Sequence, residues 1–486
     1  MRRRGAAGEG MRVGGSLFTG LNIGLSGLEA QQSVLSVTAH DVANASTPGF
    51  SRQEADLAPN PPYAAPALGQ GSGALQYGMG VRVAQIQRVS SHFLNLQLWS
   101  SDAQLGAASQ QTTTLGQVQA MLNEPSSTGI NSALSAFWNS WQALGNHAAS
   151  TAARSQVLDA GQALASQLNT LSGEWTGLTQ SLNTSVGQAV TTINGLTGQI
   201  AALNGQIGAS TAAGQSPNDL EDSRNRLITQ LASLVPVSVT WQANGQADVS
   251  LAGVQAVAGT TTLTLHATPN PANQNFLALS WGPAGIPAQI SGGSLGATLT
   301  LRDQTVPGYL AQLNALASGV ATAVNAQHAQ GYDATGASTA TVPFFTSSAG
   351  GTITAANLAV NPNLVANPAG IGAASSATSG PGDGSNAVAI ANLQNSAFLA
   401  GGSETPGGAY ATLVGQVGSD TSAAQGAQAN QQTLQQSIQN QQQQVSGVSI
   451  NGEMTTMVEA QNAYAAAARV VTTIDGMLGT LIGMVQ

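Results

Sequence analysis

Hydrophobic residues recur at alternating steps of four and three at both ends of the chain, which is the spacing of one helix face. The N-terminal stripe runs from residue 21 to 42, and the C-terminal stripe runs from 450 to 471, slips by one step and continues to 485. So narrow a stripe predicts a helix that needs a partner helix. The two ends are predicted to pair with each other and with neighbouring subunits, so self-assembly is the first functional hypothesis. The apolar positions assigned to assembly are Leu21, Leu25, Leu28, Leu35, Val42, Met454, Met457, Tyr464, Val471, Ile474, Leu478, Leu481 and Val485.

The pattern between the two stripes is mostly helical. The first helix should end around Val42 to Asn44, because Pro48 disfavours helix before it and Gly49 permits a positive φ. A short strand is expected over 80–86, and helix from about Phe93 to residue 235. Its longest apolar run, 164–207, would span roughly 65 Å as one helix. Such a length is typical of a rod.

Strand patterns begin after Pro236. Alternating residues flank a predicted hairpin turn at Asn244-Gly245, and further strand-like runs follow up to residue 294. Ser216 is predicted to cap the helix before this region, with Pro217 in the first turn and Asp219 reaching back. The glutamine-rich stretch 425–444 is predicted to be helical rather than disordered, because its apolar spacing persists.

These patterns predict a mainly α protein with a small β domain. The terminal helices form a coiled-coil inner domain, the body is a rod of long helices, and the β domain is inserted on the outside. The predicted divisions are a disordered extension at 1–16, a terminal coiled-coil domain at 17–60 and 446–486, a helical body at 61–236 and 295–445 with a loop-rich part at 333–405, and the outer β domain at 237–294.

Composition narrows the possible functions. Only 7% of the 486 residues are charged and 4% are aromatic, which suits helices packed through small residues. No lysine occurs, which excludes Schiff-base and phosphate-loop chemistry, and the net charge of −9 argues against a nucleic-acid partner. No cysteine occurs, so disulfides and thiolate chemistry are absent. The arginines at 2–4 precede no apolar run, so a cleaved signal peptide is not expected. Met11 is an alternative start of the chain. No stretch is expected to have the length of a membrane span.

Motifs that could carry chemistry have simpler explanations. Gly292-Gly293-Ser294-Leu295-Gly296 matches a nucleophile elbow, but His328 is the one histidine after it and no α/β series of strands surrounds it. The five histidines lack the spacings of metal sites. The charge cluster at 219–226 is interpreted as an exposed helix face with an Asp222–Arg226 pair. We therefore expect no enzyme activity, no catalytic or metal-binding residues and no cofactor.

The terminal segments resemble a known family. The first runs from Leu21 to Gln53 and includes Asn44-Ala45-Ser46-Thr47-Pro48-Gly49-Phe50. The second runs from Met454 to Val485 and includes Glu459-Ala460-Gln461-Asn462-Ala463-Tyr464 and Ala468-Arg469-Val470. Both resemble the bacterial flagellar rod, hook and hook-associated axial proteins. Interior segments around 215–227, 292–308, 323–333 and 446–454 resemble the hook-associated protein 1 branch. The resemblance adds Asn44, Thr47, Pro48, Gly49, Phe50 and Arg469 to the candidate assembly residues.

The resemblance implies a structural protein that joins the hook to the filament as a ring of subunits. It implies export through the flagellar type III apparatus, location at the hook–filament junction, and as partners the hook protein, the second hook-associated protein and an export chaperone. The chain looks short for the family, which suggests reduced outer domains. A hook or distal-rod protein is the alternative within the family, and a secreted serine hydrolase using Ser294 is the alternative outside it.

Overall fold

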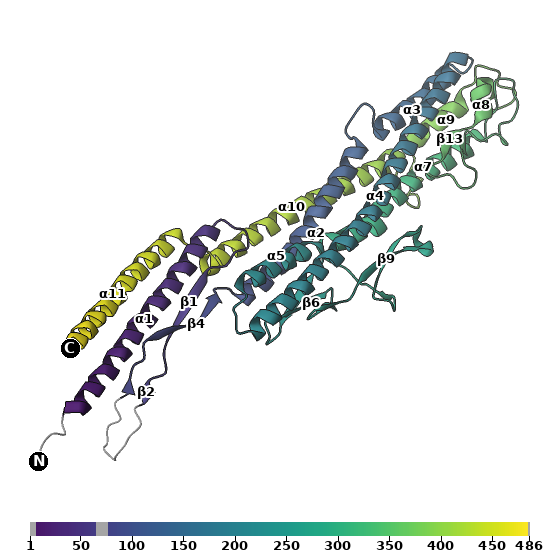
Figure 1. Ribbon diagram of the computed structural model, residues 1–486. Helices are drawn as coiled ribbons and strands as arrows, with labels where there is room; N and C mark the ends of the chain where they lie inside the picture. Colours follow the sequence, from purple (N-terminus) through teal and green to yellow (C-terminus); the bar gives the residue numbers. More distant parts are fainter. Residues whose placement is uncertain (1–5, 65–75, 485–486) are drawn as a thin grey trace, which may run out of the picture.

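The computed structural model describes residues 6–64 and 76–484, with side chains for 17–62 and 78–484. The described chain is an elongated rod, with the terminal helices at one end and short helices and loops at the other (Figure 1). The α-helices are α1 (Ala6–Asn44), α2 (His92–Leu122), α3 (Ile130–Asn146), α4 (Thr151–Ala212), α5 (Asn218–Leu234), α6 (Gly293–Thr300), α7 (Val306–His328), α8 (Pro362–Ala366), α9 (Ser385–Asn392), α10 (Pro406–Ser446) and α11 (Ile450–Gly483). The strands are β1 (Gln53–Pro59), β2 (Tyr63–Ala64), β3 (Gln76–Tyr77), β4 (Val81–Arg88), β5 (Val237–Trp241), β6 (Ala247–Leu251), β7 (Val254–Ala258), β8 (Thr261–Thr262), β9 (Leu265–Asn270), β10 (Phe276–Trp281), β11 (Ile286–Pro287), β12 (Phe345–Ser347) and β13 (Leu358–Val360). This architecture confirms the predicted fold class.

Helix α4 is the long central helix of the rod. It is continuous over 62 residues, or about 93 Å at ~1.5 Å per residue, which confirms the predicted long helix. The Ser150 hydroxyl caps its first turn by accepting from the Ala153 N–H at 3.2 Å. Several of its glycines, including Gly173 and Gly195, have open space where a side chain would be. These glycines do not interrupt the helix, because its leucine and isoleucine face is buried along most of its length.

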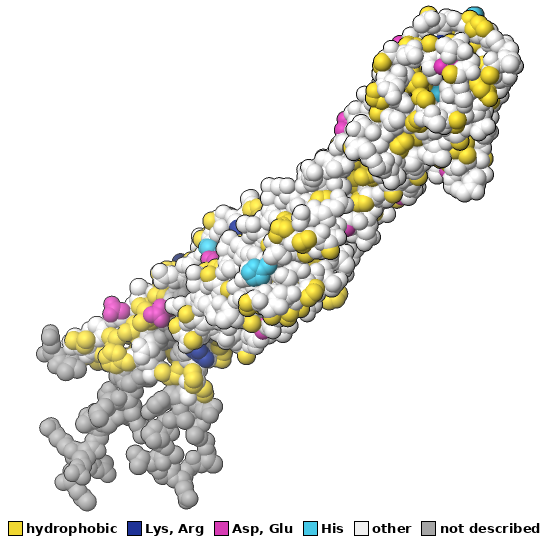
Figure 2. Space-filling view, turned by 90° about the vertical axis from the view of Figure 1, so that its right-hand side faces the viewer, with side chains coloured by type: hydrophobic (Ala, Val, Ile, Leu, Met, Phe, Trp, Pro, Cys, Tyr) yellow, Lys and Arg dark blue, Asp and Glu magenta, His cyan; other side chains and the backbone are white. Residues whose placement is uncertain are grey.

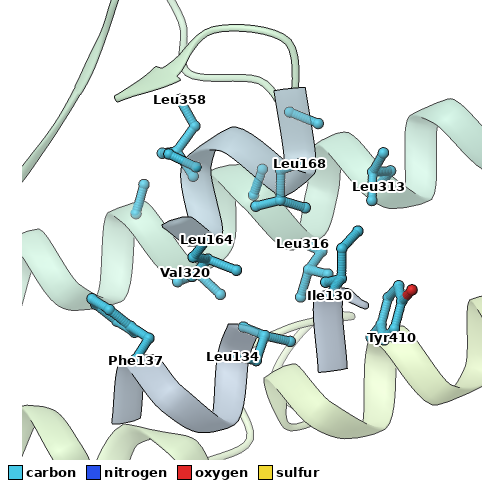
Figure 3. Close-up of a cluster of buried hydrophobic side chains, with 14 of the residues drawn as sticks. Ile130, Leu134, Phe137, Leu164, Leu168, Leu313, Leu316, Val320, Leu358 and Tyr410 are labelled. Carbon is cyan, nitrogen blue, oxygen red and sulfur yellow. The ribbon is translucent and has the colours of Figure 1, made fainter. Parts of the chain in front are cut away.

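Two hydrophobic clusters hold the body together. In the cluster nearer the loop-rich end, side chains from α3, α4, α7, α10 and β13 converge, as Phe137, Leu164, Leu316 and Tyr410 do in Figure 3. The second cluster lies between α4, α5 and the β region, and includes Ile200, Ile228 and Trp281. Because one face of α4 contributes to both clusters, the long helix makes the two parts of the body continuous.

The β region consists of two small antiparallel sheets beside α4. Their strand orders are β5-β6-β7-β8 and β11-β10-β9, and Gly245 in the predicted hairpin turn has a φ of 80°. Two asparagines of α4 bind strand backbone directly. Asn194 exchanges two hydrogen bonds with Leu265, and buried Asn204 exchanges two with Ala247 and donates a third to Gly259. The sheets are therefore fixed to the rod by amide side chains as well as by apolar packing.

Three local expectations differ from the structure. Helix α5 begins at Asn218 after Pro217, and Ser216 does not cap it. Asp219 does not reach back but accepts a hydrogen bond from Gln53 Nε2 at 2.8 Å, because β1 lies against the start of α5. Helix α1 already begins at Ala6, inside the extension expected to be disordered, while residues 1–5 lie outside the described residues. A helix that is stabilised further along can extend by one hydrogen bond per added residue.

Candidate functional site

The terminal helices α1 and α11 pack against each other in antiparallel directions at one end of the rod (Figure 1). The contact face of α1 includes the glycines at 20, 24 and 27. A Cβ at Gly24 would lie 2.7 Å from Val471 Cγ2, and a Cβ at Gly27 would lie 3.5 Å from Ala467 Cβ. Glycine permits this close approach because it has no side chain. The pairing of the two ends thus depends on small residues that the apolar pattern did not single out.

The leucine stripe of α1 lies beside this glycine face. At about 100° per residue, positions 21, 25 and 28 point roughly a quarter turn away from positions 20, 24 and 27. Leu25 is 49% exposed, and Leu21, Leu28, Leu35 and Val42 are half-buried. The opposite side of α1 is covered by the β1–β4 ribbon, where the Val81 N–H donates to Ser26 Oγ at 3.3 Å. Leu25 therefore lies on a side of α1 that its own chain leaves open, and the other stripe positions are partly covered.

The candidate residues of α11 divide between its two sides. Half-buried toward α1 are Met457, Val471, Ile474 and Leu478, whereas Met454, Tyr464, Arg469 and Leu481 are exposed. Val485 lies outside the described residues. An 18-residue window within 406–483 has a mean hydropathy of 1.3, and none of it is buried. By length and composition alone this window would suffice for a membrane span, which differs from the expectation that no stretch has that length. Figure 2 shows hydrophobic side chains gathered at this end of the molecule.

The turn after α1 has the conformation that its sequence predicts. The helix ends at Asn44, and Gly49 has a φ of 76°. Asn44 Nδ2 donates to the His40 carbonyl at 3.0 Å, and its Oδ1 accepts from Thr47 Oγ1 at 3.2 Å. Pro48 is exposed, and the Phe50 ring meets the His40 ring edge-on at 5.4 Å between centroids. The turn is thus a locally bonded unit that redirects the chain from α1 into β1.

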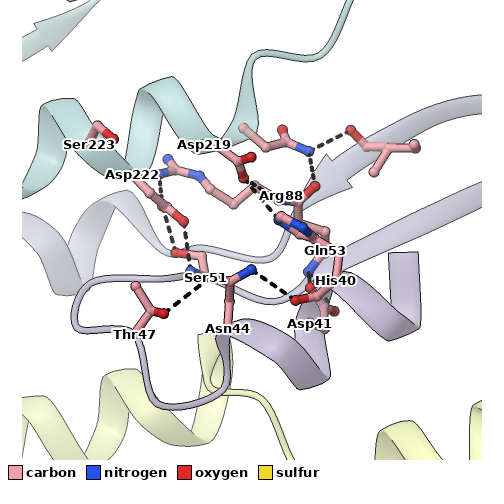
Figure 4. A network of polar contacts seen from close by, with 12 residues as sticks. His40, Asp41, Asn44, Thr47, Ser51, Gln53, Arg88, Asp219, Asp222 and Ser223 are labelled. Atoms are coloured by element: carbon pink, nitrogen blue, oxygen red, sulfur yellow. Dashed lines mark hydrogen bonds and ion pairs between the residues drawn. The ribbon is translucent and has the colours of Figure 1, made fainter. Parts of the chain in front are cut away.

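The charge cluster of α5 joins this turn to the body. Asp222 accepts from the Ser51 N–H at 2.7 Å and from Ser51 Oγ at 2.9 Å, and it forms an ion pair with Arg88 at 2.7 Å (Figure 4). Arg88 also lies 3.2 Å from Glu221. The predicted Asp222–Arg226 pair is wrong, because Asp222 is buried under β4 and Arg226 bonds Ser223 instead.

Arg224 is the other part of the cluster that the sequence misassigned. It is 1% exposed and donates to the Gly245 carbonyl at 2.7 Å and to Asn204 Oδ1 at 3.3 Å. Burial lowers the pKa of its guanidinium to about 10, so it is charged at neutral pH. The 219–226 segment is therefore a joint between terminal helices, ribbon and β region, in which Asp222 and Arg224 are buried while Asp219 and Arg226 are exposed. No local sequence signal identifies partners such as Arg88, which lies 134 residues from Asp222.

A groove of about 1090 Å³ runs beside the joint. Its walls are the 45–51 turn, α2, α5 and the segment that links α10 to α11, and they include Trp99, Asn225, Arg226 and Gln443. A Cβ at Gly49 would lie 2.5 Å from Arg226 Cγ, so the arginine side chain lies directly over the turn. The groove therefore separates the terminal helices from the body on this side of the molecule.

The hydrolase alternative has no geometry to support it. Ser294 is in the first turn of α6, where its carbonyl accepts from Thr298 Oγ1. His328 is fully buried, with Nδ1 3.0 Å from the Val342 carbonyl and Nε2 accepting from the Gly372 N–H at 3.0 Å. Burial lowers its pKa to about 4, so the ring is neutral and both nitrogens are engaged. Over the part of the chain that the structure describes, no group of three His, Cys, Asp or Glu side chains could hold a metal ion.

Comparison with known proteins gives the class. Residues 21–50 match the "Flagella basal body rod protein" model, and residues 439–484 match the "Flagellar basal body rod FlgEFG protein C-terminal" model. These matches coincide with the turn at the end of α1 and with the exposed helix α11. They place the chain among the rod-related structural proteins of the bacterial flagellum.

The body identifies the branch. Residues 115–345 match the "Flagellar hook-associated protein FlgK helical domain" model. Flagellar hook-associated protein 1 of Bacillus subtilis is 30% identical over 96% of this chain and 98% of its own length. The Escherichia coli protein of the same name is 27% identical over 96% and 99%. The flagellar hook junction protein FlgK from Burkholderia pseudomallei has the same fold, with a TM-score of 0.64 and 21% identity over 72% of this chain and all of that one. The chain belongs to the flagellar hook-associated protein 1 family.

Proposed function

We propose that this chain joins hook to filament by helical self-assembly of its terminal helices into a ring. The observation that supports the proposal is the exposed apolar surface of α1 and α11. Leu25, Met454 and Leu481 belong to the predicted stripes, yet they remain exposed in the single chain. Large exposed apolar surfaces on a soluble subunit mark places where other molecules bind. Equivalent helices of neighbouring subunits are the partners that the same spacing fits.

The matched segments at the ends are shared with rod proteins, so a hook or distal-rod role is the competing proposal. The match over 115–345 favours the junction role, because it covers most of the body rather than the ends. In the assembly that we propose, the terminal helices contact the hook protein below and the second hook-associated protein above. The β region lies on the body away from the terminal helices and would face outward (Figure 1).

Export is part of the proposal. The flagellar type III apparatus would carry the chain without a cleaved signal peptide, and an export chaperone would cover the apolar side of α11 until assembly. The terminal helices bury little apolar area, with Gln32, Ala39 and Gln461 exposed on the stripes. We therefore expect the free subunit to be a monomer with both terminal segments largely disordered, so that protease digestion of dilute protein removes them first.

A strain lacking this gene tests the junction role. We expect complete hooks without filaments, with flagellin shed into the medium, and rescue by the full-length chain. Loss of the hook itself would support the hook or rod alternative and refute the junction role. The non-enzymatic role that we propose is tested with a serine-reactive fluorophosphonate probe, where labelling at Ser294 of the purified chain would contradict it.

A further inference from the structure

Two buried carboxyl groups lie where the terminal helices meet the ribbon. Asp41, near the end of α1, has 0% of its surface exposed, and Glu453, in the first turn of α11, has 7%. Both oxygens of Asp41 accept from the Gln53 N–H, at 3.2 and 3.0 Å (Figure 4). The neighbouring Arg52 N–H donates to the Ser446 carbonyl at 2.9 Å. When the terminal helices dock, α1, β1 and the start of α11 therefore come together around Asp41.

The charges around Asp41 do not balance. Glu453 of α11 raises its pKa, whereas Arg52 before β1 and His40 of α1 lower it. Arg52 also pairs with Glu54 at 2.8 Å, and its side chain is 32% exposed, so its charge is shared and partly solvated. His40 lies 3.4 Å from Asp219 of α5. Arg52 thus acts on three acids, Asp41, Glu54 and Glu453.

Burial is the main cause of the resulting shift. It raises the pKa of Asp41 to about 6, and the nearby Glu453 adds to the rise. Burial likewise raises the pKa of Glu453, with Arg52 opposing it. An Asp41 that is exposed in the undocked chain has its ordinary pKa of 3.8. Docking therefore favours the protonated form. Its stabilising contribution is fully present below about pH 3.8 and is lost as the pH rises through about 6.

We propose that the Asp41–Glu453 pair is a built-in brake on the terminal helices, which couples their docking on each other and on the β1–β4 ribbon to proton uptake and opposes it at neutral pH. This inference rests on the proposed self-assembly. In the free subunit near neutral pH the joint has to bury a carboxylate, so the terminal helices stay undocked. In the assembly, the apolar contacts of neighbouring helices supply the free energy that closes the joint. The brake thereby delays the docking of α1 and α11 until assembly.

The test follows docking in the full-length chain. Because the chain has no cysteine, Gln32→Cys on α1 and Gln461→Cys on α11 provide two defined sites for nitroxide labels. Both positions are exposed on helices that pack together, so dipolar broadening reports docking. With pKa values of about 3.8 undocked and about 6 docked, the docking equilibrium constant should rise about tenfold between pH 7.5 and pH 5.0. An equilibrium constant that is equal at the two pH values would overturn the proposal.

Two variants test whether Asp41 and Glu453 cause the pH dependence of docking. Asp41→Asn keeps an oxygen acceptor for the Gln53 N–H and removes the charge, so at every pH it should dock about as well as the fully protonated parent protein, roughly 160-fold better than the parent protein at pH 7.5. Glu453→Gln should give a smaller change in the same direction. Asp56→Asn, an exposed carboxylate of β1, is the control and should keep the full pH response. A full response in Asp41→Asn, or weaker docking of that variant at every pH, would refute the brake. These measurements use free protein, so loss of the junction role in cells would be recognised separately.

Discussion

Close packing at Gly24 of α1 gives the sharpest test of the terminal helix pair. Replacing Gly24 with alanine adds one methyl group whose carbon would lie 2.7 Å from Val471 Cγ2 and 3.7 Å from the Val471 nitrogen. Valine is short and branched at Cβ, so it cannot swing its methyl group away. The helices must move apart by several tenths of an ångström. Gly27→Ala is a matched control, because its added carbon would lie 3.5 Å from Ala467 Cβ, an ordinary contact.

The expected cost follows from the difference between the two sites. Both substitutions gain up to about 1 kcal/mol because alanine forms helix better than glycine. Overpacking at Gly24→Ala weakens the pairing free energy by about 1–3 kcal/mol, whereas Gly27→Ala causes no overpacking. The two variants should therefore differ by about 1–3 kcal/mol in pairing free energy. At ~1.4 kcal/mol per factor of ten, the pairing constants should differ by roughly 5- to 160-fold.

Amide hydrogen exchange of α11 in the full-length chain measures this difference directly, at a pH where the parent protein shows protection. In cells, Gly24→Ala should increase the flagellin shed into the medium, and Gly27→Ala should not. If the two variants were equally protected and equally able to hold filaments, α1 and α11 would not pack through this glycine face.

Three further predictions concern the body, the turn and the apolar stripe of α11. Asn204→Ala removes the Asn204 hydrogen bonds to buried polar groups of Ala247, Gly259 and Arg224. It should therefore lower the free energy of unfolding of the body, measured by calorimetry, by at least about 2 kcal/mol. The control Gln206→Ala, at an exposed position of the same helix, should change that free energy little. Gly49→Val should impair filament attachment more than export, because the φ of 76° and the nearby Arg226 side chain exclude a branched side chain. Attachment is measured from the flagellin shed into the medium, and export from the amount of this chain that is secreted. Normal attachment would contradict the prediction. Leu478→Asp with Leu481→Asp should weaken chaperone binding and filament attachment in pull-down and swimming assays, since each partner would have to desolvate carboxylates. The pair Thr473→Asp and Thr480→Asp, at exposed positions off the stripe, should be milder, and equal damage would show that the stripe is misassigned.

The sequence alone determined the elements of this protein and its class. Periodicity of apolar residues predicted a long helix over 164–207, which lies within α4, and the glutamine-rich part of α10, because a helix face repeats in the sequence itself. Pro48 and Gly49 predicted the end of α1. The Asn244-Gly245 turn and the positive φ of Gly49 were predictable for a similar reason, since backbone conformation there is set by the residue type. The terminal motifs by themselves indicated the flagellar family.

Tertiary structure decided which face of each element meets which partner. The leucine stripe of α1 has the stronger apolar pattern, but α11 packs on the glycines beside it, because backbones that approach closely need positions without side chains. Asp222 pairs with Arg88 across 134 residues and not with Arg226 on its own helix, because β4 lies over α5 and buries it. Asp41 and Glu453 are more than 400 positions apart in the sequence, and only the antiparallel return of α11 brings them together. Contacts between distant segments depend on how the helices are placed in space, and no local spacing in the sequence encodes that placement.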